Sequence, residues 1–161
     1  MMDKEAIYNI LETVKDPEIP VISIIDLGIL RNVEVAEDGA LVVSITPTYT
    51  GCPAMDTIER EIKYKLEKAG HRVQVKSLIA PAWTTDWITE RGRKNLEEYG
   101  IAPPAEATTD KSFLTGTHKD IRCPQCKSTN TQMISHFGST ACKALYRCND
   151  CHEPFDYFKC I

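Results

Sequence analysis

The sequence has almost no cysteine before residue 123, and it has no long apolar run. Of its seven cysteines, only Cys52 lies outside the last 39 residues. No apolar run approaches the ~20 residues of a membrane-spanning helix. The charged, periodic start, MMDKEAIYNILETVKD, is unlike a signal peptide. These absences predict a cytoplasmic protein with no membrane segment, whose cysteines bind metal or act as thiols rather than form disulfides.

Positive charge is also scarce. Residues 1–120 carry fourteen Lys and Arg against twenty Asp and Glu, a net charge of −6, and residues 121–161 carry five against three. Neither part has the basic excess that is typical of nucleic-acid-binding domains. We therefore expect protein partners or bound metal, and no nucleic-acid partner.

The motifs of redox and phosphate-binding enzymes are missing as well. The chain has no Gly-rich dinucleotide or phosphate loop. It also lacks the paired Glu and Glu-x-x-His motifs that hold a di-iron centre between helices. The sequence therefore predicts an accessory protein rather than an enzyme.

Apolar periodicity alternates between that of helices and that of strands over the first hundred residues. Helical spacing predicts helices over 3–15, 54–69 and 84–100, and alternation predicts strands over 29–36, 40–46 and 71–79. Thr85 or Asp86 is expected to cap the third helix. The order helix–strand–strand–helix–strand–helix predicts an α+β fold, in which helices cover one face of a small mixed sheet.

The pattern changes twice along the chain, which indicates two domains. Residues 1–100 form the predicted α+β domain. Residues 101–120 have no periodicity and begin with Pro103-Pro104, so we interpret them as a linker. Residues 121–161 form a small C-terminal domain that holds six cysteines.

Two Cys-x-x-Cys pairs occupy this C-terminal domain. Cys123 and Cys126 form the first pair, Cys148 and Cys151 form the second, and twenty-one residues separate them. Each pair lets one tight turn present two sulfurs to an ion, so two turns complete a tetrahedral zinc site. A segment this short cannot bury enough apolar surface to fold alone. We therefore expect a β-hairpin ribbon that is stabilised by structural Zn²⁺.

Some alternatives stay open for the other thiols and for the metal. Iron in a rubredoxin-like site would use the same four ligands. Reversible disulfides or a thiol oxidoreductase are disfavoured, because no thioredoxin-like pattern surrounds the first pair. Cys142 is a candidate for a second thiol site, and Cys160 is a weaker one. The alternative for both is a small buried hydrophobe.

Aromatic side chains of the C-terminal domain are candidate anchors for a protein partner. The alternative is that they pack within the domain itself. The residues are Tyr146, Phe155, Tyr157 and Phe158, and the same question applies to Trp83 and Trp87.

Cys52 stands in the stretch PTYTGCPAMD, between Gly51 and Pro53. Pro53 suits the first position of a helix, which predicts Cys52 as the N-cap. Its sulfur would then face unpaired backbone N–H groups at the positive end of the helix dipole, and both favour the thiolate. Cys52 is therefore a candidate reactive or metal-binding thiolate. A structural cysteine at an interface is the alternative.

Three motifs in order resemble the small domain of iron–sulfur cluster maturation factors of the SufT and cytosolic assembly type. In that family the corresponding elements form one site. The resemblance covers residues 5 to about 80, and it implies that Cys52 transiently binds iron or a cluster. Asp26 would be an oxygen ligand or a proton carrier, and Glu18 a weaker candidate. The motifs are Asp16-Pro17-Glu18, Asp26-Leu27-Gly28, and Thr46 with Gly51-Cys52-Pro53.

The whole chain is similar to the PaaD family of phenylacetyl-CoA epoxidase systems, through the stretches IAPAWTTDWITERGRKNLEEYGIAPP, FGSTACKALYRC and EPFDYFKC. This resemblance implies a bacterial protein of aerobic phenylacetate degradation, which supports ring 1,2-epoxidation without catalysing it. It would mature the iron–sulfur reductase component, and oxygenase subunits are further expected partners. The alternative is a non-catalytic structural or adaptor subunit of the oxygenase complex.

A single Cys52 is too few to hold a cluster, because iron–sulfur clusters usually take four cysteines. A homodimer that joins two Cys52 residues, or ligands from a partner or a small thiol, would have to supply the rest.

Overall fold

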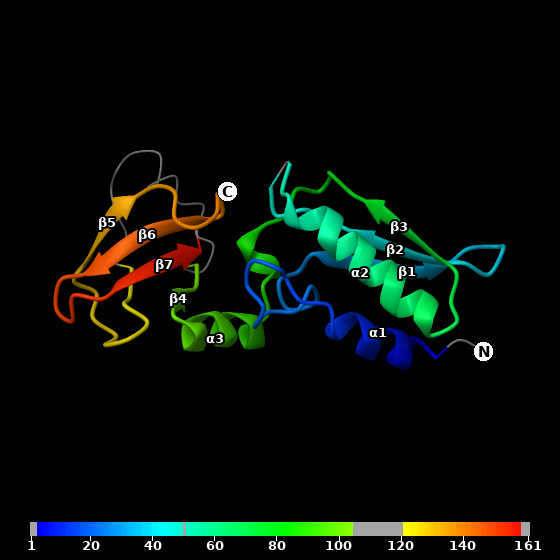
Figure 1. The fold of residues 1–161 in the computed structure, drawn as a ribbon, viewed down its shortest axis with the longest axis horizontal. Coiled ribbons are helices and arrows are strands. Elements are labelled where there is room, and N and C mark those ends of the chain that lie inside the picture. Colours follow the sequence, from blue (N-terminus) through cyan, green and yellow to red (C-terminus); the bar gives the residue numbers. More distant parts are fainter. Residues whose placement is uncertain (1–2, 50, 105–120, 159–161) are drawn as a thin grey trace. The chain divides into compact units, whose positions relative to one another are not determined.

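The structure is a computed structural model, and it describes residues 3–49, 51–104 and 121–158. The chain divides into two compact units, Met1–Gly92 and Arg93–Ile161. Figure 1 shows the elements of both units. In chain order they are α1 (Lys4–Glu12), β1 (Leu30–Val35), β2 (Leu41–Ile45), α2 (Ala54–Lys68), β3 (Val73–Ser77), the 3-10 helix η1 (Thr85–Trp87), α3 (Glu90–Tyr99), β4 (Ile101–Ala102), β5 (Thr131–Ser135), β6 (Lys143–Cys148) and β7 (Pro154–Phe158).

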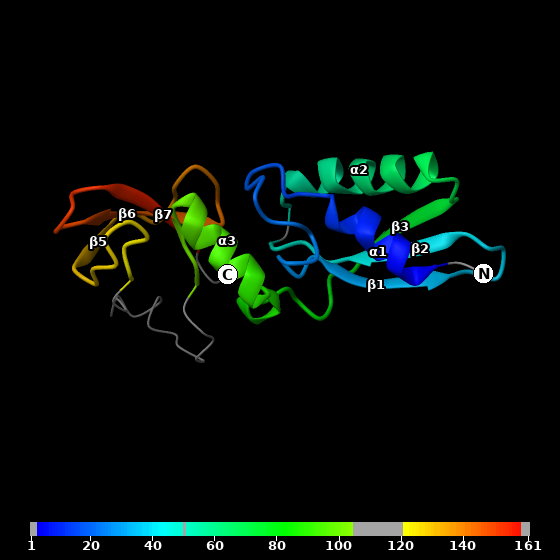
Figure 2. The ribbon, with the colours of Figure 1, turned by 90° about the horizontal axis from the view of Figure 1, so that it is seen from below.

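The first unit contains a mixed sheet of three strands in the order β1-β2-β3. β1 pairs antiparallel with β2, and β2 pairs parallel with β3. Figure 2 shows α2 lying along one face of this sheet. The predicted α+β fold is therefore confirmed, and all five residues of the central strand β2 are buried.

Two amphipathic helices complete the core of this unit. α1 is capped by Asp3, whose side chain accepts a hydrogen bond from the backbone N–H of Glu5, and it buries Ile7 and Leu11. α2 buries Ile58 and the two apolar residues that follow at helical spacing, Ile62 and Leu66. The apolar stripes of the sequence therefore mark the faces that the helices bury.

The third helix begins later than the sequence predicts. Residues Thr85–Trp87 form a separate 3-10 turn, and Ile88 returns to extended backbone before α3 starts at Glu90. The hydroxyl of Thr89 accepts a hydrogen bond from the N–H of Gly92 at 3.0 Å, so Thr89 caps α3 in place of Thr85 or Asp86. The predicted N-cap was wrong because a local turn interrupts the apparent helical pattern.

The second unit contains a sheet of four strands in the order β4-β7-β6-β5. The predicted hairpin is present as β5 and β6, which pair antiparallel. Two strands were not predicted from the sequence: β7, which pairs antiparallel with β6, and β4, which pairs parallel with β7. β4 is formed by the first two residues of the predicted linker, and residues 105–120 lie outside the described residues.

The division between the units falls inside α3, ahead of residue 100. Contacts within the second unit explain this, because Lys127 pairs with Glu97 of α3 and β4 joins the sheet directly after the helix. The C-terminal half of α3 therefore belongs with the strands that follow it.

The aromatic residues of the C-terminal domain pack within it. Tyr146 stacks on Phe155 with the ring centroids 5.9 Å apart, and it meets Tyr157 edge-on at 5.5 Å. Tyr146, Phe155 and Phe158 are all buried. Packing within the domain thus accounts for these side chains, and they are not exposed anchors.

Candidate functional site

The four paired cysteines converge in the second unit, as the spacing predicts. Their sulfur atoms all lie within 4.8 Å of one another. Cys123 Sγ is 3.7 Å from Cys151 Sγ, and Cys126 Sγ is 3.5 Å from Cys148 Sγ. A tetrahedral ion with metal–sulfur bonds of ~2.3 Å would place its sulfurs about 3.8 Å apart. The thiols are therefore spaced as the ligands of one metal ion.

Two similar turns bring the thiols together. The residue after each pair has a left-handed backbone, with φ of 65° at Lys127 and 64° at His152. In the first turn the N–H of Lys127 donates to Cys123 O at 3.0 Å. In the second, the N–H of Cys151 approaches Cys148 Sγ at 3.5 Å. Backbone N–H groups directed at sulfur stabilise thiolates, as a metal site requires.

The thiols depart from ordinary acidity in opposite directions. The N–H of Cys151 is the largest of the influences that lower the pKa of Cys148 to about 7. The N–H of Glu153 acts to lower the pKa of Cys151, but burial and the neighbouring thiols outweigh it and raise that pKa to about 12. Four thiolates this close repel one another, so a cation is needed to hold all four deprotonated.

Cys52 lies one residue further from α2 than the sequence predicts. Pro53 is the N-cap, and its side chain makes no capping hydrogen bond. The N–H of Cys52 donates to Tyr49 O, and Cys52 O accepts from the N–H of Met55, each at 3.2 Å. The prediction of Cys52 as the N-cap was wrong, because the backbone turns at Cys52 before the helix begins. The Cys52 side chain is half-buried.

Thr46, at the end of β2, has an unusual buried hydroxyl. The residue is 2% exposed, and its N–H donates to Ile29 O at 2.9 Å. Thr46 Oγ1 is the one buried side-chain N or O atom without a hydrogen-bond partner in the described part of the chain. A buried hydroxyl with no partner costs free energy, which indicates a group that this site accommodates.

Asp26 is buried, and both of its carboxylate oxygens are engaged. Oδ1 accepts from the Thr89 hydroxyl at 2.7 Å, and Oδ2 accepts from Arg91 Nε at 2.9 Å. The backbone carbonyl of Asp26 also accepts from the N–H of Thr89. Thr89 and Arg91 were not predicted as partners of Asp26, because no local pattern links residues more than sixty positions apart.

Further contacts hold the segment from Trp83 to Gly92 on the same turn. Trp83 Nε1 donates to Leu27 O at 2.8 Å. A Cβ at Gly28, whose φ is +78°, would lie 2.5 Å from Trp87 Cβ, so only glycine permits this approach. The Asp-Leu-Gly motif is thus the platform on which the segment after β3 packs.

Asp16 organises the remaining motif. Its Oδ1 accepts from the N–H of Glu18 at 2.7 Å and from the N–H of Ile19 at 3.2 Å. The Glu18 side chain is half-buried. Among the described residues, the four ribbon cysteines are the one group of three or more Cys, His, Asp and Glu that converges closely enough for a metal. Cys52, Asp26 and Glu18 do not form such a group.

Cys142 is buried, and its Sγ lies 3.0 Å from the hydroxyl of Thr140. It does not belong to the convergent cysteine group. Its role as a second thiol site stays a prediction, and Cys160 lies outside the described residues.

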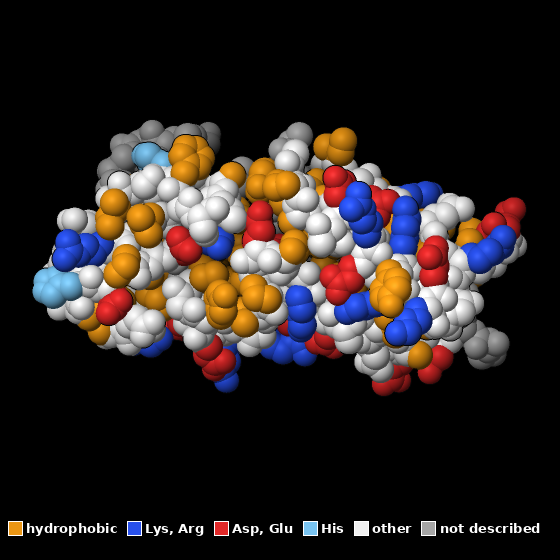
Figure 3. Space-filling view, viewed as in Figure 1, with side chains coloured by type: hydrophobic (Ala, Val, Ile, Leu, Met, Phe, Trp, Pro, Cys, Tyr) orange, Lys and Arg blue, Asp and Glu red, His pale blue; other side chains and the backbone are white. Residues whose placement is uncertain are grey.

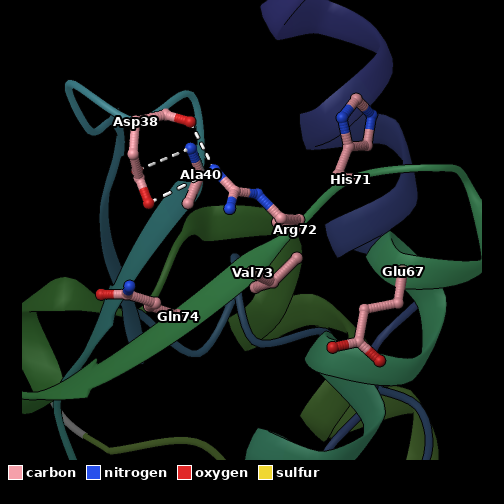
Figure 4. Close-up of a pocket in the computed structure, with 7 residues that line it drawn as sticks. All are labelled: Asp38, Ala40, Glu67, His71, Arg72, Val73 and Gln74. Carbon is pink, nitrogen blue, oxygen red and sulfur yellow. Dashed lines mark hydrogen bonds and ion pairs between the residues drawn. The ribbon is translucent and has the colours of Figure 1, made fainter.

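A surface pocket near the start of β3 offers no comparable constellation (Figure 4). Arg72 reaches the hairpin before β2, where it pairs with Asp38 Oδ2 at 3.3 Å. His71 and Glu67 point away from each other in Figure 4. This pocket therefore carries no converging catalytic or metal-binding groups.

The surface of α2 is mixed in charge, and Figure 3 shows acidic and basic side chains interspersed there. Ion pairs at helical spacing, such as Lys63 with Glu59, explain part of this pattern. None of the helices in the described ranges is long and apolar enough to cross a membrane.

Comparison with known families defines the class of both parts of the chain. Residues 4–77 match the model of an iron–sulfur cluster assembly protein, and residues 107–159 match a PaaD zinc beta ribbon domain. A crystal structure of a domain of unknown function, DUF59, from Bacillus anthracis has a TM-score of 0.53 and 26% identity, over 58% of this chain and 90% of that one. This protein therefore joins an assembly-type domain to a zinc-ribbon-type domain.

Two sequence relatives identify the family. An Escherichia coli (strain K12) protein, named as a putative PaaD-type component of 1,2-phenylacetyl-CoA epoxidase, is 50% identical over 156 residues, which cover 96% of this chain and 92% of that protein. A Porphyromonas gingivalis protein named "Fe-S protein maturation auxiliary factor" is 37% identical over 60% of this chain and 92% of its own length. The chain belongs to the PaaD family of 1,2-phenylacetyl-CoA epoxidase systems.

Proposed function

We propose that this protein is a maturation factor for iron–sulfur proteins and that Cys52 carries its cargo. The observation that supports this most directly is the match of residues 4–77 to an iron–sulfur cluster assembly protein, because this range contains Cys52. The Porphyromonas gingivalis relative named as a maturation auxiliary factor supports the same role. Maturation delivers a cofactor to another protein, so the role is accessory and not enzymatic.

Cys52 would bind iron or a cluster through its thiolate, and the recipient would remove it by ligand exchange. Thr46 lies in the same motif, and its unpartnered hydroxyl is suited to donate a hydrogen bond to a sulfide or thiolate. Asp26 stays a proposed oxygen ligand or proton carrier, with Glu18 as the weaker candidate. Each carboxylate oxygen of Asp26 already accepts one hydrogen bond, so ligation would use its second lone pair.

The ribbon would hold one structural Zn²⁺. Cys123, Cys126, Cys148 and Cys151 supply four thiolates, the usual ligand set of structural zinc sites. Zinc would neutralise their mutual repulsion and tie both turns together. No ligand position would remain open, so the site would stabilise the domain rather than bind a substrate.

The recipient would be the iron–sulfur reductase component of the phenylacetyl-CoA epoxidase system, in the cytoplasm. The name of the Escherichia coli relative links this family to that epoxidase. A homodimer that brings two Cys52 thiolates together, or ligands from the recipient, would complete the coordination of a cluster.

Metal and acid-labile sulfide per chain, measured on anaerobically purified protein, test this function. One zinc in both wild type and Cys52→Ser, with iron and sulfide only in wild type, would make Cys52 the cargo ligand. Iron and sulfide retained in Cys52→Ser would overturn that role. If neither protein holds iron, the recipient's cluster content in cells becomes the deciding measurement, and an unchanged content in Cys52→Ala cells would overturn the proposal.

A second candidate is a non-catalytic adaptor within the oxygenase complex, which the word "subunit" in the name of the Escherichia coli relative favours. Size-exclusion chromatography with the oxygenase components separates the two functions. A stable stoichiometric complex supports the adaptor, and transient association supports the maturation factor.

A further inference from the structure

Two loops lie side by side at one end of the first sheet. β2 and β3 are adjacent and parallel, and Ile45 is paired with Ser77 at their carboxyl ends. The N–H of Leu78 donates to Ile45 O at 2.7 Å, just beyond the last pair. The loop after β2 leads to Cys52, and the loop after β3 leads to Trp83. Both loops therefore leave the sheet at the same edge.

Neither loop contains a charged residue. The sequence has no Asp, Glu, Lys or Arg over 46–55 or over 77–85, although 26% of the whole chain is charged. Interfaces between proteins are depleted of charge at their centres. We call residues 47–49, 51–53 and 78–82 the uncharged loop pair.

The uncharged loop pair is apolar and open to solvent. Ile79 is 79% exposed, the largest value among the exposed large hydrophobic residues of the described chain. Ala80, Pro81 and Ala82 after it are also exposed, as are Gly51 and Pro53 on either side of Cys52. Figure 3 shows hydrophobic side chains at the surface where these strands end. An exposed apolar surface beside a functional group indicates a binding surface.

We propose that the uncharged loop pair is the docking surface for the protein that receives the cargo of Cys52. This inference rests on the proposed function. Transfer requires a recipient cysteine to come within bonding distance of Cys52 Sγ, which is half-buried. A recipient that reaches this sulfur must cover the loops around it, and an apolar, uncharged contact surface is the one that fits them.

Transfer itself is a ligand exchange that leaves the electrons of the iron unchanged. One Fe–S bond to Cys52 breaks as one Fe–S bond to a recipient cysteine forms. The proton lost by the recipient thiol passes to the Cys52 thiolate, which is left as a thiol.

A second copy of the chain is the other occupant to consider, and two observations disfavour it. The loop pair holds far fewer residues than the ~20–30 on each side of a stable interface. Two copies would also bring together two bodies that each carry a net charge of −6 over residues 1–120. A transient contact with a different protein fits both observations better.

The test uses the full zinc-loaded chain and the reductase component stripped of its cluster as the probe. Ile79→Glu and Ile79→Lys should each weaken binding at least about tenfold, because either charge must be desolvated at an apolar contact. Val35→Glu is the matched control. Val35 is also an exposed aliphatic residue, 51% exposed, but it pairs with Leu41 at the opposite end of the sheet. Its binding should change less than about twofold.

Three results would overturn the docking surface. The first is equal weakening by Ile79→Glu and Val35→Glu, and the second is no binding of the stripped reductase by wild type. The third is a dimer, seen by sedimentation equilibrium, that Ile79→Glu dissociates, because it would assign the loops to a second copy. Opposite effects of Glu and Lys at Ile79 would also contradict an apolar contact.

Cys52→Ser separates docking from transfer. It should bind the stripped reductase within about twofold of wild type, because one thiol-to-hydroxyl change at a half-buried position leaves the exposed loops intact, yet it should deliver no cluster. If Cys52→Ser still delivers cluster while Ile79→Glu fails to bind, the proposed function of Cys52 fails and the docking surface stands.

Discussion

Asp26 and Arg91 form an ion pair across sixty-five positions of the chain, with Oδ2 of the carboxylate accepting from Nε at 2.9 Å. The carboxylate is buried, while the arginine side chain is 56% exposed and also pairs with Glu12. This pair fastens the start of α3 to the Asp-Leu-Gly turn.

Asp26→Asn should loosen the segment from Trp83 to Gly92, because it removes the charge from a hydrogen bond to a buried carboxylate. We expect a loss of about 1.5–3 kcal/mol in the local free energy of opening, measured by amide hydrogen exchange over this segment. Glu12→Gln is the control, since its pair with Arg91 is exposed and should contribute less than about 1 kcal/mol. Equal effects of the two substitutions would contradict the assigned role of Asp26.

Gly28→Ala should destabilise the first unit more than a glycine substitution normally does. The new Cβ would lie 2.5 Å from Trp87 Cβ and 2.6 Å from Trp87 O. We expect a loss of more than about 2 kcal/mol in the free energy of unfolding, from strain and displacement combined. Urea unfolding of the zinc-loaded chain measures it.

Gly39→Ala is the control for backbone strain alone. Gly39 has φ of +80°, and a Cβ there would meet nothing within 4 Å. It should cost only about 1 kcal/mol. A loss at Gly39 as large as that at Gly28 would show that contact with Trp87 adds nothing.

Thr46→Val should leave the stability of the cargo-free protein unchanged or raise it by up to about 1 kcal/mol. The hydroxyl it removes is buried without a partner in the described chain. Thr89→Val is the contrast, because its hydroxyl donates to Asp26 and accepts from Gly92. It should cost about 1–3 kcal/mol. Thermal unfolding measures both, and a loss at Thr46 equal to that at Thr89 would indicate a partner for its hydroxyl.

Cys148→Ser should abolish zinc binding and unfold the second unit, because a metal site with three thiolates loses the free energy that stabilises so small a core. Zinc per chain should fall from about one to near zero, and the amide signals of β5, β6 and β7 should lose dispersion while those of β1–β3 persist. Cys142→Ser should keep its zinc. Zinc lost in Cys142→Ser but kept in Cys148→Ser would reverse the assigned ligand set.

Much of the fold follows from periodicity, and the ribbon site follows from spacing. The stripe of Ile58, Ile62 and Leu66 marked α2 because a helix must bury one face. The two Cys-x-x-Cys pairs marked the metal group because each spacing permits one turn geometry. Both signals are local in the sequence or repeat at fixed intervals.

The contacts around Asp26 could not be predicted in the same way. They depend on a carbonyl of Leu27, a hydroxyl of Thr89 and the guanidinium of Arg91, which meet only after the chain has folded. The start of α3 was misplaced for a related reason. Thr89 caps the helix, but the Thr-Thr-Asp sequence before it offers several equally good caps.

The parallel pairing of β4 with β7 affects how the ribbon could be produced alone. A fragment that starts at residue 107, where the zinc-ribbon match begins, would lack β4. The edge of β7 would then expose unpaired N–H and C=O groups, which invite pairing with the same edge of another molecule and aggregation. A fragment that starts ahead of Arg93 keeps this edge covered and retains the Lys127–Glu97 pair.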